Sequence, residues 1–425
     1  MISIFYHMNE GTIKFVFIIM IILSILFTIG YYSRYVGIVL FFLFANLMTA
    51  NPYVVHAVEF MLEVSLFWAL FLPLDHNFAV KKTKFSQDTL IMKVASFGIL
   101  FQIFLIYLTS VLTKSGEYWR KGIVIESATD DLTFGYWLAP YLADLPQICQ
   151  LLTYGSLVLE FFIAFCIFFP FKNPTFRFLA AISIPILHFS IGTAMYVGPF
   201  FLSTLCFAAI LIPSFFWKKT KYKKWAFKPI VPPKLPVRYF SLALMGFAIF
   251  LMIHKNLFKW QKESYISGFV QNIPLINKFA AWPNNRPGIF LGVWDQPWYF
   301  FAPDPYKDMG TIIMVGRDQS GQMKELLLDR PFKYTKDNEG NVIFDQPLNN
   351  AFTKSRFVYS FYARRLLKKF PRSAIKKWLA KEEKYKNKNG RRIQQAKCFY
   401  YSNQTSYENG QFKRERKLFE LASYP

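Results

Sequence analysis

The sequence has few of the side chains that build metal centres or disulfide frameworks. Its four cysteines form no Cys-x-x-Cys pair, and its five histidines are scattered; the cysteines are Cys149, Cys166, Cys206 and Cys398. These spacings predict no metal site and no disulfide scaffold. The first three cysteines lie in or beside apolar stretches, where we interpret them as small buried residues.

Acidic residues are also scarce. The 425 residues include 26 Asp and Glu against 50 Lys and Arg, which gives a formal net charge of +24. A basic chain can indicate nucleic-acid binding. Much of this charge, however, lies in short loops between apolar runs, and positive loops beside spans mark the cytoplasmic side of a membrane. We therefore expect a lipid bilayer, and no nucleic acid, as partner.

Long apolar runs dominate the first part of the chain. Hydrophobic residues make up 53% of the sequence, and a helix that crosses a bilayer needs about 20 of them in a row. Eight runs predict spans at 13–32, 36–50, 57–73, 89–112, 148–170, 176–196, 199–217 and 237–254. Residues 1–12 lack the basic segment and cleavage site of a signal peptide. The sequence thus predicts an all-α membrane bundle over residues 1–254.

The loop charges predict the orientation of this bundle. Basic clusters follow the third, fifth and seventh runs, the last with eight Lys and Arg and no acid between residues 218 and 238. With eight spans these loops share one side, which the positive-inside rule places in the cytoplasm. The loop 113–147, where acids outnumber bases, and the C-terminal part then lie outside the cell membrane.

Residues 255–425 are polar and predict a small extracytoplasmic domain of α+β or β-rich class. The runs 311–317 and 322–329 flank Asp318-Gln319-Ser320-Gly321, a hairpin signal. A second strand pair surrounds residues 338–341, and strands at 394–402 and 410–421 flank Asn409-Gly410. Residues 354–385 predict a helix interrupted by Pro371.

One stretch places an ionisable side chain at the end of a predicted span. Residues 107–122 (YLTSVLTKSGEYWRKG) end a span with Lys114, followed by Gly116, Trp119 and Gly122. Charged residues inside hydrocarbon are costly and mark functional sites. In one interpretation the lysine stem lies along lipid and its ammonium reaches water. In the other, desolvation favours the neutral amine, which then acts as a base.

Further ionisable side chains lie within or at the edge of the predicted spans. They are His56 and Glu59 at the start of the third run, Glu160 in the fifth and His188 in the sixth. Intramembrane acids and histidines are candidates for function. Each also has a structural interpretation: Glu160 as a protonated acid bonded to a neighbouring helix, and His188 as a packing residue.

The order of these motifs resembles a known family. Lys-x-Gly-x-x-Trp-x-x-Gly after a span is similar to the horizontally transferred transmembrane (HTTM) domain family, which includes vitamin K-dependent gamma-carboxylase. Asn51-Pro52 with FWALFLPL (67–74), LVLEFFIAF around Glu160, LHFSIG around His188 and GVWDQPWYFFAPDP (292–305) resemble its further blocks. That family has one more helix before the run at 13–32. We therefore expect either that Met1 is not the natural start or that this helix was lost.

The resemblance implies an activity. It makes Lys114 the base that deprotonates vitamin K hydroquinone, a menaquinol-type quinol, with O₂ and CO₂ as co-substrates and a secreted peptide as acceptor. It assigns His56, His188 and Glu160 to the catalytic group and Trp119 and Glu59 to the quinol. Its bacterial members, with the abundance of Lys, Ile and Phe here, imply the cytoplasmic membrane of a bacterium.

A different class of function remains open. The bundle could be a non-catalytic anchor that presents the C-terminal domain or binds a lipid or partner. Lys114→Arg is then harmless, whereas a general base does not tolerate arginine, which stays protonated. The catalytic hypothesis instead requires Lys114, His56 and His188 to meet at one place.

Overall fold

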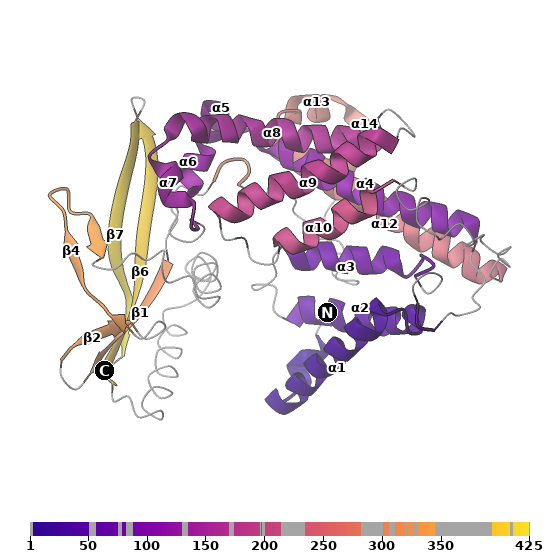
Figure 1. Ribbon diagram of the computed structural model, residues 1–425, viewed down its shortest axis with the longest axis horizontal. Helices are drawn as coiled ribbons and strands as arrows, with labels where there is room; N and C mark the ends of the chain where they lie inside the picture. Colours follow the sequence, from indigo (N-terminus) through magenta and orange to yellow (C-terminus); the bar gives the residue numbers. More distant parts are fainter. Residues whose placement is uncertain are drawn as a thin grey trace. The chain divides into compact units, whose positions relative to one another are not determined.

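The computed structural model is mainly helical and ends in an antiparallel sheet (Figure 1). It describes residues 3–50, 57–74, 79–81, 88–129, 135–169, 174–195, 197, 200–213, 234–281, 301–305, 311–318, 321–325, 330–344, 393–408 and 411–424. The chain divides into two compact units. One comprises Met1–Arg120, Tyr154–Phe189 and Gly198–Asp304, and the other Lys121–Thr153, Ser190–Val197 and Pro305–Pro425.

Helices occupy the apolar runs. After a short 3-10 turn at Ile4–His7 they are α1 (Glu10–Thr28), α2 (Ser33–Ala50), α3 (Ala57–Ala69), α4 (Thr89–Thr113), α8 (Pro146–Phe168), α9 (Pro174–Ala194), α10 (Phe200–Leu211) and α12 (Leu235–Lys262). Shorter helices are α5 (Glu117–Lys121), α6 (Val124–Thr129), α7 (Ala139–Ala143), α13 (Ser267–Asn272) and α14 (Pro274–Ala281).

In the part of the chain that the structure describes, six helices are long and apolar enough to cross a membrane: α1, α2, α4, α8, α9 and α12. They confirm six of the eight predicted spans. At the other two positions α3 and α10 have 13 and 12 residues. Pro73 and Pro213 follow their ends, and a proline disfavours helical geometry in the residue before it. The prediction overestimated these two lengths for that reason.

The helix α12 is longer than its apolar run predicted. The run ends near residue 254, but the helix continues to Lys262. Lys255, Lys259 and Lys262 follow with the spacing of one helical face, so the extra turns are amphipathic. An apolar-run criterion cannot detect such turns. The helix therefore continues across the boundary that the sequence predicted between bundle and C-terminal domain.

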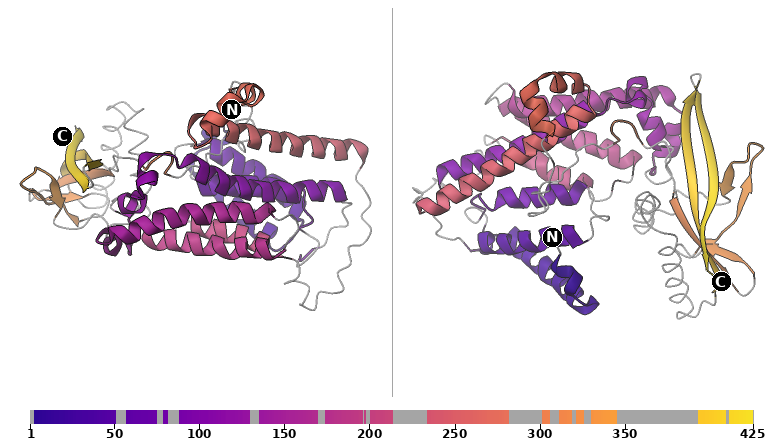
Figure 2. Two further views of the ribbon diagram at one scale, coloured as in Figure 1. Left: turned by 90° about the horizontal axis from the view of Figure 1, so that it is seen from above. Right: turned by 180° about the vertical axis from the view of Figure 1, so that it is seen from behind.

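The helix α4 has the largest buried share of the six long helices and is packed along α12 (Figure 2). Asp88 caps the start of α4 through the Leu90 amide and forms an ion pair with Arg238 in the first turn of α12. Near the other ends, the Thr109 hydroxyl donates to the Asn256 side chain, and the Tyr265 amide donates to the Leu112 carbonyl at 3.0 Å. Because start lies beside start and end beside end, these contacts show that α4 and α12 run parallel.

The strands form a five-stranded antiparallel sheet and a separate hairpin. The sheet order is β3-β2-β1-β6-β7, from β1 (Thr311–Asp318), β2 (Met323–Glu325), β3 (Arg330–Pro331), β6 (Ile393–Glu408) and β7 (Gln411–Tyr424). The hairpin pairs β4 (Tyr334–Lys336) with β5 (Val342–Phe344). Ile313, Val315 and Tyr401 face a core that includes Phe332 and Val342. The three predicted strand pairings are confirmed, whereas the predicted helix 354–385 lies outside the described residues.

The β4–β5 turn is held by one carboxylate. The side chain of Asp337 accepts hydrogen bonds from the Asn341 and Glu339 amides at 2.8 and 2.9 Å. The bonds from Asn341, and secondarily those from Glu339 and Gly340, lower the pKa of Asp337 below its ordinary 3.8. Because the folded-state pKa is lowered, the contribution of Asp337 to stability is present above pH 3.8 and is lost as the pH falls through the lower folded value.

We expect Asp337→Ala to accelerate amide hydrogen exchange in residues 334–344 at neutral pH, because the ionised carboxylate no longer holds the turn. The difference from the wild type should disappear in acid, where the wild-type carboxyl is protonated too. Exchange measured by mass spectrometry tests this, with Glu415→Gln on β7 as the control for loss of one negative charge. Equal exchange in both proteins at neutral pH would contradict the assignment.

Candidate functional site

Lys114 lies inside the protein at the end of α4. It is the C-cap residue of that helix, and its side chain is only 4% exposed. A lysine that snorkels to water keeps its ammonium exposed, so this interpretation does not fit. A cation at a helix C-terminus is stabilised by the helix dipole. Burial of the charge nevertheless requires a partner.

The partner of Lys114 is Glu160. The lysine Nζ atom donates to both carboxylate oxygens of Glu160, each at 2.6 Å. Glu160 comes from the middle of α8 and is 7% exposed, so both charges are withdrawn from solvent. A buried pair of this kind is stable only while both members are present. The structural interpretation of Glu160 was therefore right that it bonds across helices, and the bonded group is the candidate base.

An aromatic ring lies against the same ammonium. The Nζ atom of Lys114 lies 4.5 Å from the centroid of the Trp119 ring, a cation–π distance. Trp119 lies on α5, is 3% exposed, and its indole N–H donates to the carbonyl of Phe301 at 2.8 Å. The ammonium thus has a carboxylate and an indole face as its neighbours. Glycine at 122 allows the chain to leave α5 with a φ of 75°.

A second polar pair lies close to the first. The hydroxyl of Tyr107, two helical turns before Lys114 on α4, lies 2.9 Å from Nε2 of His188 on α9. Both side chains are buried. Within the described part of the chain, the Nδ1 atom of His188 has no hydrogen-bond partner. The two pairs form one polar cluster from α4, α8 and α9.

Of the two remaining predicted residues, His56 lies outside the described residues. Glu59 is half-buried in the first turn of α3. Among the described residues, neither Lys114 nor Glu160 has a hydrogen bond or ion pair with Glu59. The sequence prediction missed Tyr107, although its spacing of seven residues from Lys114 places both on one face of a helix.

The segment Phe301–Asp304 approaches the loop after Lys114. The amide of Gly116 donates to the Pro303 carbonyl at 2.9 Å, next to the bond from Trp119 to Phe301. The sequence suggested both segments as motifs but gave no sign that they touch. No group of three or more His, Cys, Asp and Glu suited to a metal ion occurs in the part of the chain that the structure describes.

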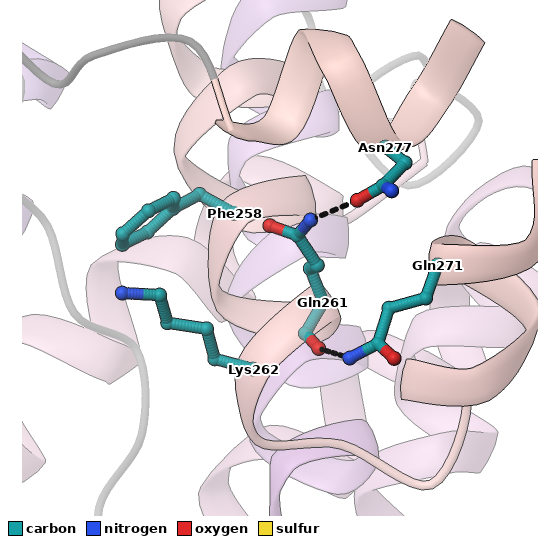
Figure 3. Close-up of a pocket in the computed structure, with 5 residues that line it drawn as sticks. All are labelled: Phe258, Gln261, Lys262, Gln271 and Asn277. Atoms are coloured by element: carbon teal, nitrogen blue, oxygen red, sulfur yellow. Dashed lines mark hydrogen bonds between the residues drawn. The ribbon is translucent and has the colours of Figure 1, made fainter. Parts of the chain in front are cut away.

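A pocket lies at the C-terminal end of α12. Its lining residues are Phe258, Gln261, Lys262, Gln271 and Asn277, from α12, α13 and α14 (Figure 3). The amide of Gln261 donates to the Asn277 side chain, and that of Gln271 donates to the Gln261 carbonyl. The lining holds one cation and neutral amides, without the acid–base pairing seen at Lys114.

Comparison with family models, with curated proteins and with solved structures finds no match for this chain.

We expect the Lys114–Glu160 pair to be strongly coupled in stability. Glu160→Leu should lower the free energy of unfolding by about 3–5 kcal/mol, because it leaves the ammonium buried without its carboxylate. Lys114→Met should cost a similar amount, whereas the double variant should recover much of the loss. Unfolding of the protein in detergent, followed by its thermal midpoint, tests this. Additive losses in the double variant would mean that the two side chains are not paired.

Proposed function

We propose that this protein is a membrane enzyme of the HTTM type that uses Lys114 to deprotonate an apolar quinol. The observation that carries the proposal is the buried ammonium held by both oxygens of Glu160 beneath the Trp119 ring. A base for a weakly acidic hydroxyl needs a desolvated amine with a nearby group that takes up its proton. Lys114 and Glu160 supply these two parts.

The proton movement follows from the hydrogen bond between the two side chains. In the resting pair Lys114 carries the proton, and its transfer across 2.6 Å to Glu160 leaves a neutral amine beside a neutral acid. Such a neutral pair avoids the cost of two buried charges. The amine then accepts the hydroxyl proton of the quinol. Trp119 offers a flat apolar surface, which suits a quinol ring.

The oxidation proposed is that of vitamin K hydroquinone by O₂. One oxygen atom enters the quinone epoxide and the other leaves as water, so that the hydroquinone supplies all four electrons that reduce O₂: two on conversion to the quinone level and two on epoxidation. The strongly basic alkoxide formed on the way removes a C–H proton from the acceptor side chain of a secreted peptide, and CO₂ adds to the carbanion. We assign to Tyr107 and His188 the stabilisation of developing negative charge on oxygen. His56 and Glu59 remain candidates for the quinol end of the site.

We further propose that the chain has eight spans, with α3 and α10 as the two short ones. The parallel arrangement of α4 and α12 supports α10 as a span, because three crossings between them, by α8, α9 and α10, return the chain to the same direction. The positive-inside rule then places the Lys114 end and the C-terminal domain outside a bacterial cytoplasmic membrane. In that arrangement the site is next to the side where a secreted peptide emerges.

A structural role is the second candidate, and the same ion pair favours it. A bidentate Lys–Glu contact between α4 and α8 could serve only to join two helices of a non-catalytic anchor. Arginine preserves such a contact, since its planar fork suits a carboxylate. It does not preserve a base. Lys114→Arg therefore separates the two functions.

We expect the purified protein in nanodiscs to convert vitamin K hydroquinone to its epoxide, because this step needs no peptide acceptor. Lys114→Ala and Lys114→Arg should both lose turnover, by about 10²-fold or more, the ordinary contribution of a general base. Chromatographic detection of the epoxide measures this, with Lys262→Ala in the α12 pocket as the matched control. A fully active Lys114→Arg variant would show that Lys114 is not the base, and a folded wild-type protein without turnover would support the anchor function.

A further inference from the structure

The carboxylate of Asp304 binds the backbone at the start of α5, the helix that carries Trp119. Its two oxygens accept the backbone amides of Glu117 and Tyr118 at 2.9 and 2.8 Å. These are the first amides of α5, which have no partner within the helix. Asp304 therefore acts as the N-cap of α5, although it is 187 residues away from Glu117 in sequence. A cap from so far along the chain fixes the place of α5 as well as its start.

The fit between Asp304 and the loop is tight. A Cβ atom added to Gly116 would lie 2.1 Å from the carboxyl carbon of Asp304 and 2.2 and 2.3 Å from its oxygens. Only glycine allows so close an approach at this position. Together with the bond from Gly116 to Pro303, three successive residues of the loop bind the 303–304 segment.

The same segment holds Trp119 directly. The indole N–H bond to Phe301 orients the ring whose face covers the Lys114 ammonium. Among the described residues, Asp304 has no hydrogen bond or ion pair with Lys114, and its hydrogen bonds are with the α5 amides. Any influence on the amine therefore passes through α5 and the Trp119 ring.

We propose that Asp304 is a positioning residue for Lys114: it fixes α5 so that Trp119 covers the amine and excludes water from the Lys114–Glu160 pair. Its effect on turnover rests on the proposed function, whereas its effect on the exposure of Lys114 does not. The acid at 304 and the glycine at 116 are thus required for the same reason, because both keep the Trp119 ring over the Lys114 amine.

The test measures acylation of each lysine by an amine-reactive ester, read by mass spectrometry on the full-length protein in nanodiscs. The variants are Asp304→Ala, the milder Asp304→Asn, and Gly116→Ala, which displaces the carboxylate by its methyl group. Asp337→Ala is the matched control, because Asp337 also accepts two backbone amides but does so in the β4–β5 turn. Gly155→Ala controls for the added methyl, since nothing lies within 4 Å of it.

Lys114 should react faster in the three loop variants by about 5- to 30-fold, the factor that loss of a helix cap gives. In the three loop variants the other lysines should be acylated at the wild-type rate. In both control variants Lys114 should be acylated at the wild-type rate. Because Asp304 acts through Trp119, Asp304→Ala should add little to the acceleration already caused by Trp119→Leu. In the epoxidation assay, kcat should fall while the KM for hydroquinone stays unchanged, since Asp304 is not assigned to quinol binding.

Two results would overturn the inference. One is wild-type acylation of Lys114 in the Asp304 variants. The other is an acceleration shared by all lysines, which indicates general unfolding. If the wild-type protein oxidises no hydroquinone, the proposed function fails, but the acylation rates still decide the role of Asp304.

Discussion

A buried ion pair between Lys114 and Glu160 is the contact on which the rest of the candidate site depends. Two opposite charges withdrawn from water stabilise the protein only if their geometry is close and both are present. Here the geometry is set by the end of α4, the middle of α8 and the Trp119 face. The pair thus joins helices and, in the same contact, keeps an amine away from solvent. The stability of the fold and the proposed chemistry therefore depend on the same contact.

The candidate site also includes two segments outside the long helices, one after α4 and one after α12. The residues after Lys114 form a loop and the short helix α5, whose amides are capped by Asp304 and whose tryptophan is bonded to Phe301. Tyr118 and Trp119 of this segment are buried. The long-range hydrogen bonds act together with this burial and connect a local motif to the segment beyond α12. The Lys114 motif and the Phe-Ala-Pro-Asp segment function as one structural element.

The sequence predicted what periodicity and residue type can reveal. Apolar runs located the helices, turn residues located the three strand pairs, and the cost of intramembrane charge identified Lys114 and Glu160. Periodicity assigns a residue to a face but does not name its partner, so the Lys114–Glu160 and Tyr107–His188 contacts were not predicted. The role of Asp304 could not be predicted for another reason, because the α5 amides that it binds are far away in sequence. The lengths of α3 and α10 were overestimated because these helices end before Pro73 and Pro213 although the apolar run extends further, and the length of α12 was underestimated because its last turns are amphipathic.

The most direct test of the central claim is to locate the quinol. A photoreactive quinone analogue, activated in nanodiscs and mapped by mass spectrometry, reports which residues lie against the ring. We expect labels on peptides that carry Tyr107, Trp119 and the residues around Glu160, and we expect hydroquinone to suppress them. Labels confined to α1 and α2, or labels that hydroquinone does not suppress, would contradict the assignment of Lys114 and Glu160 to a quinol site.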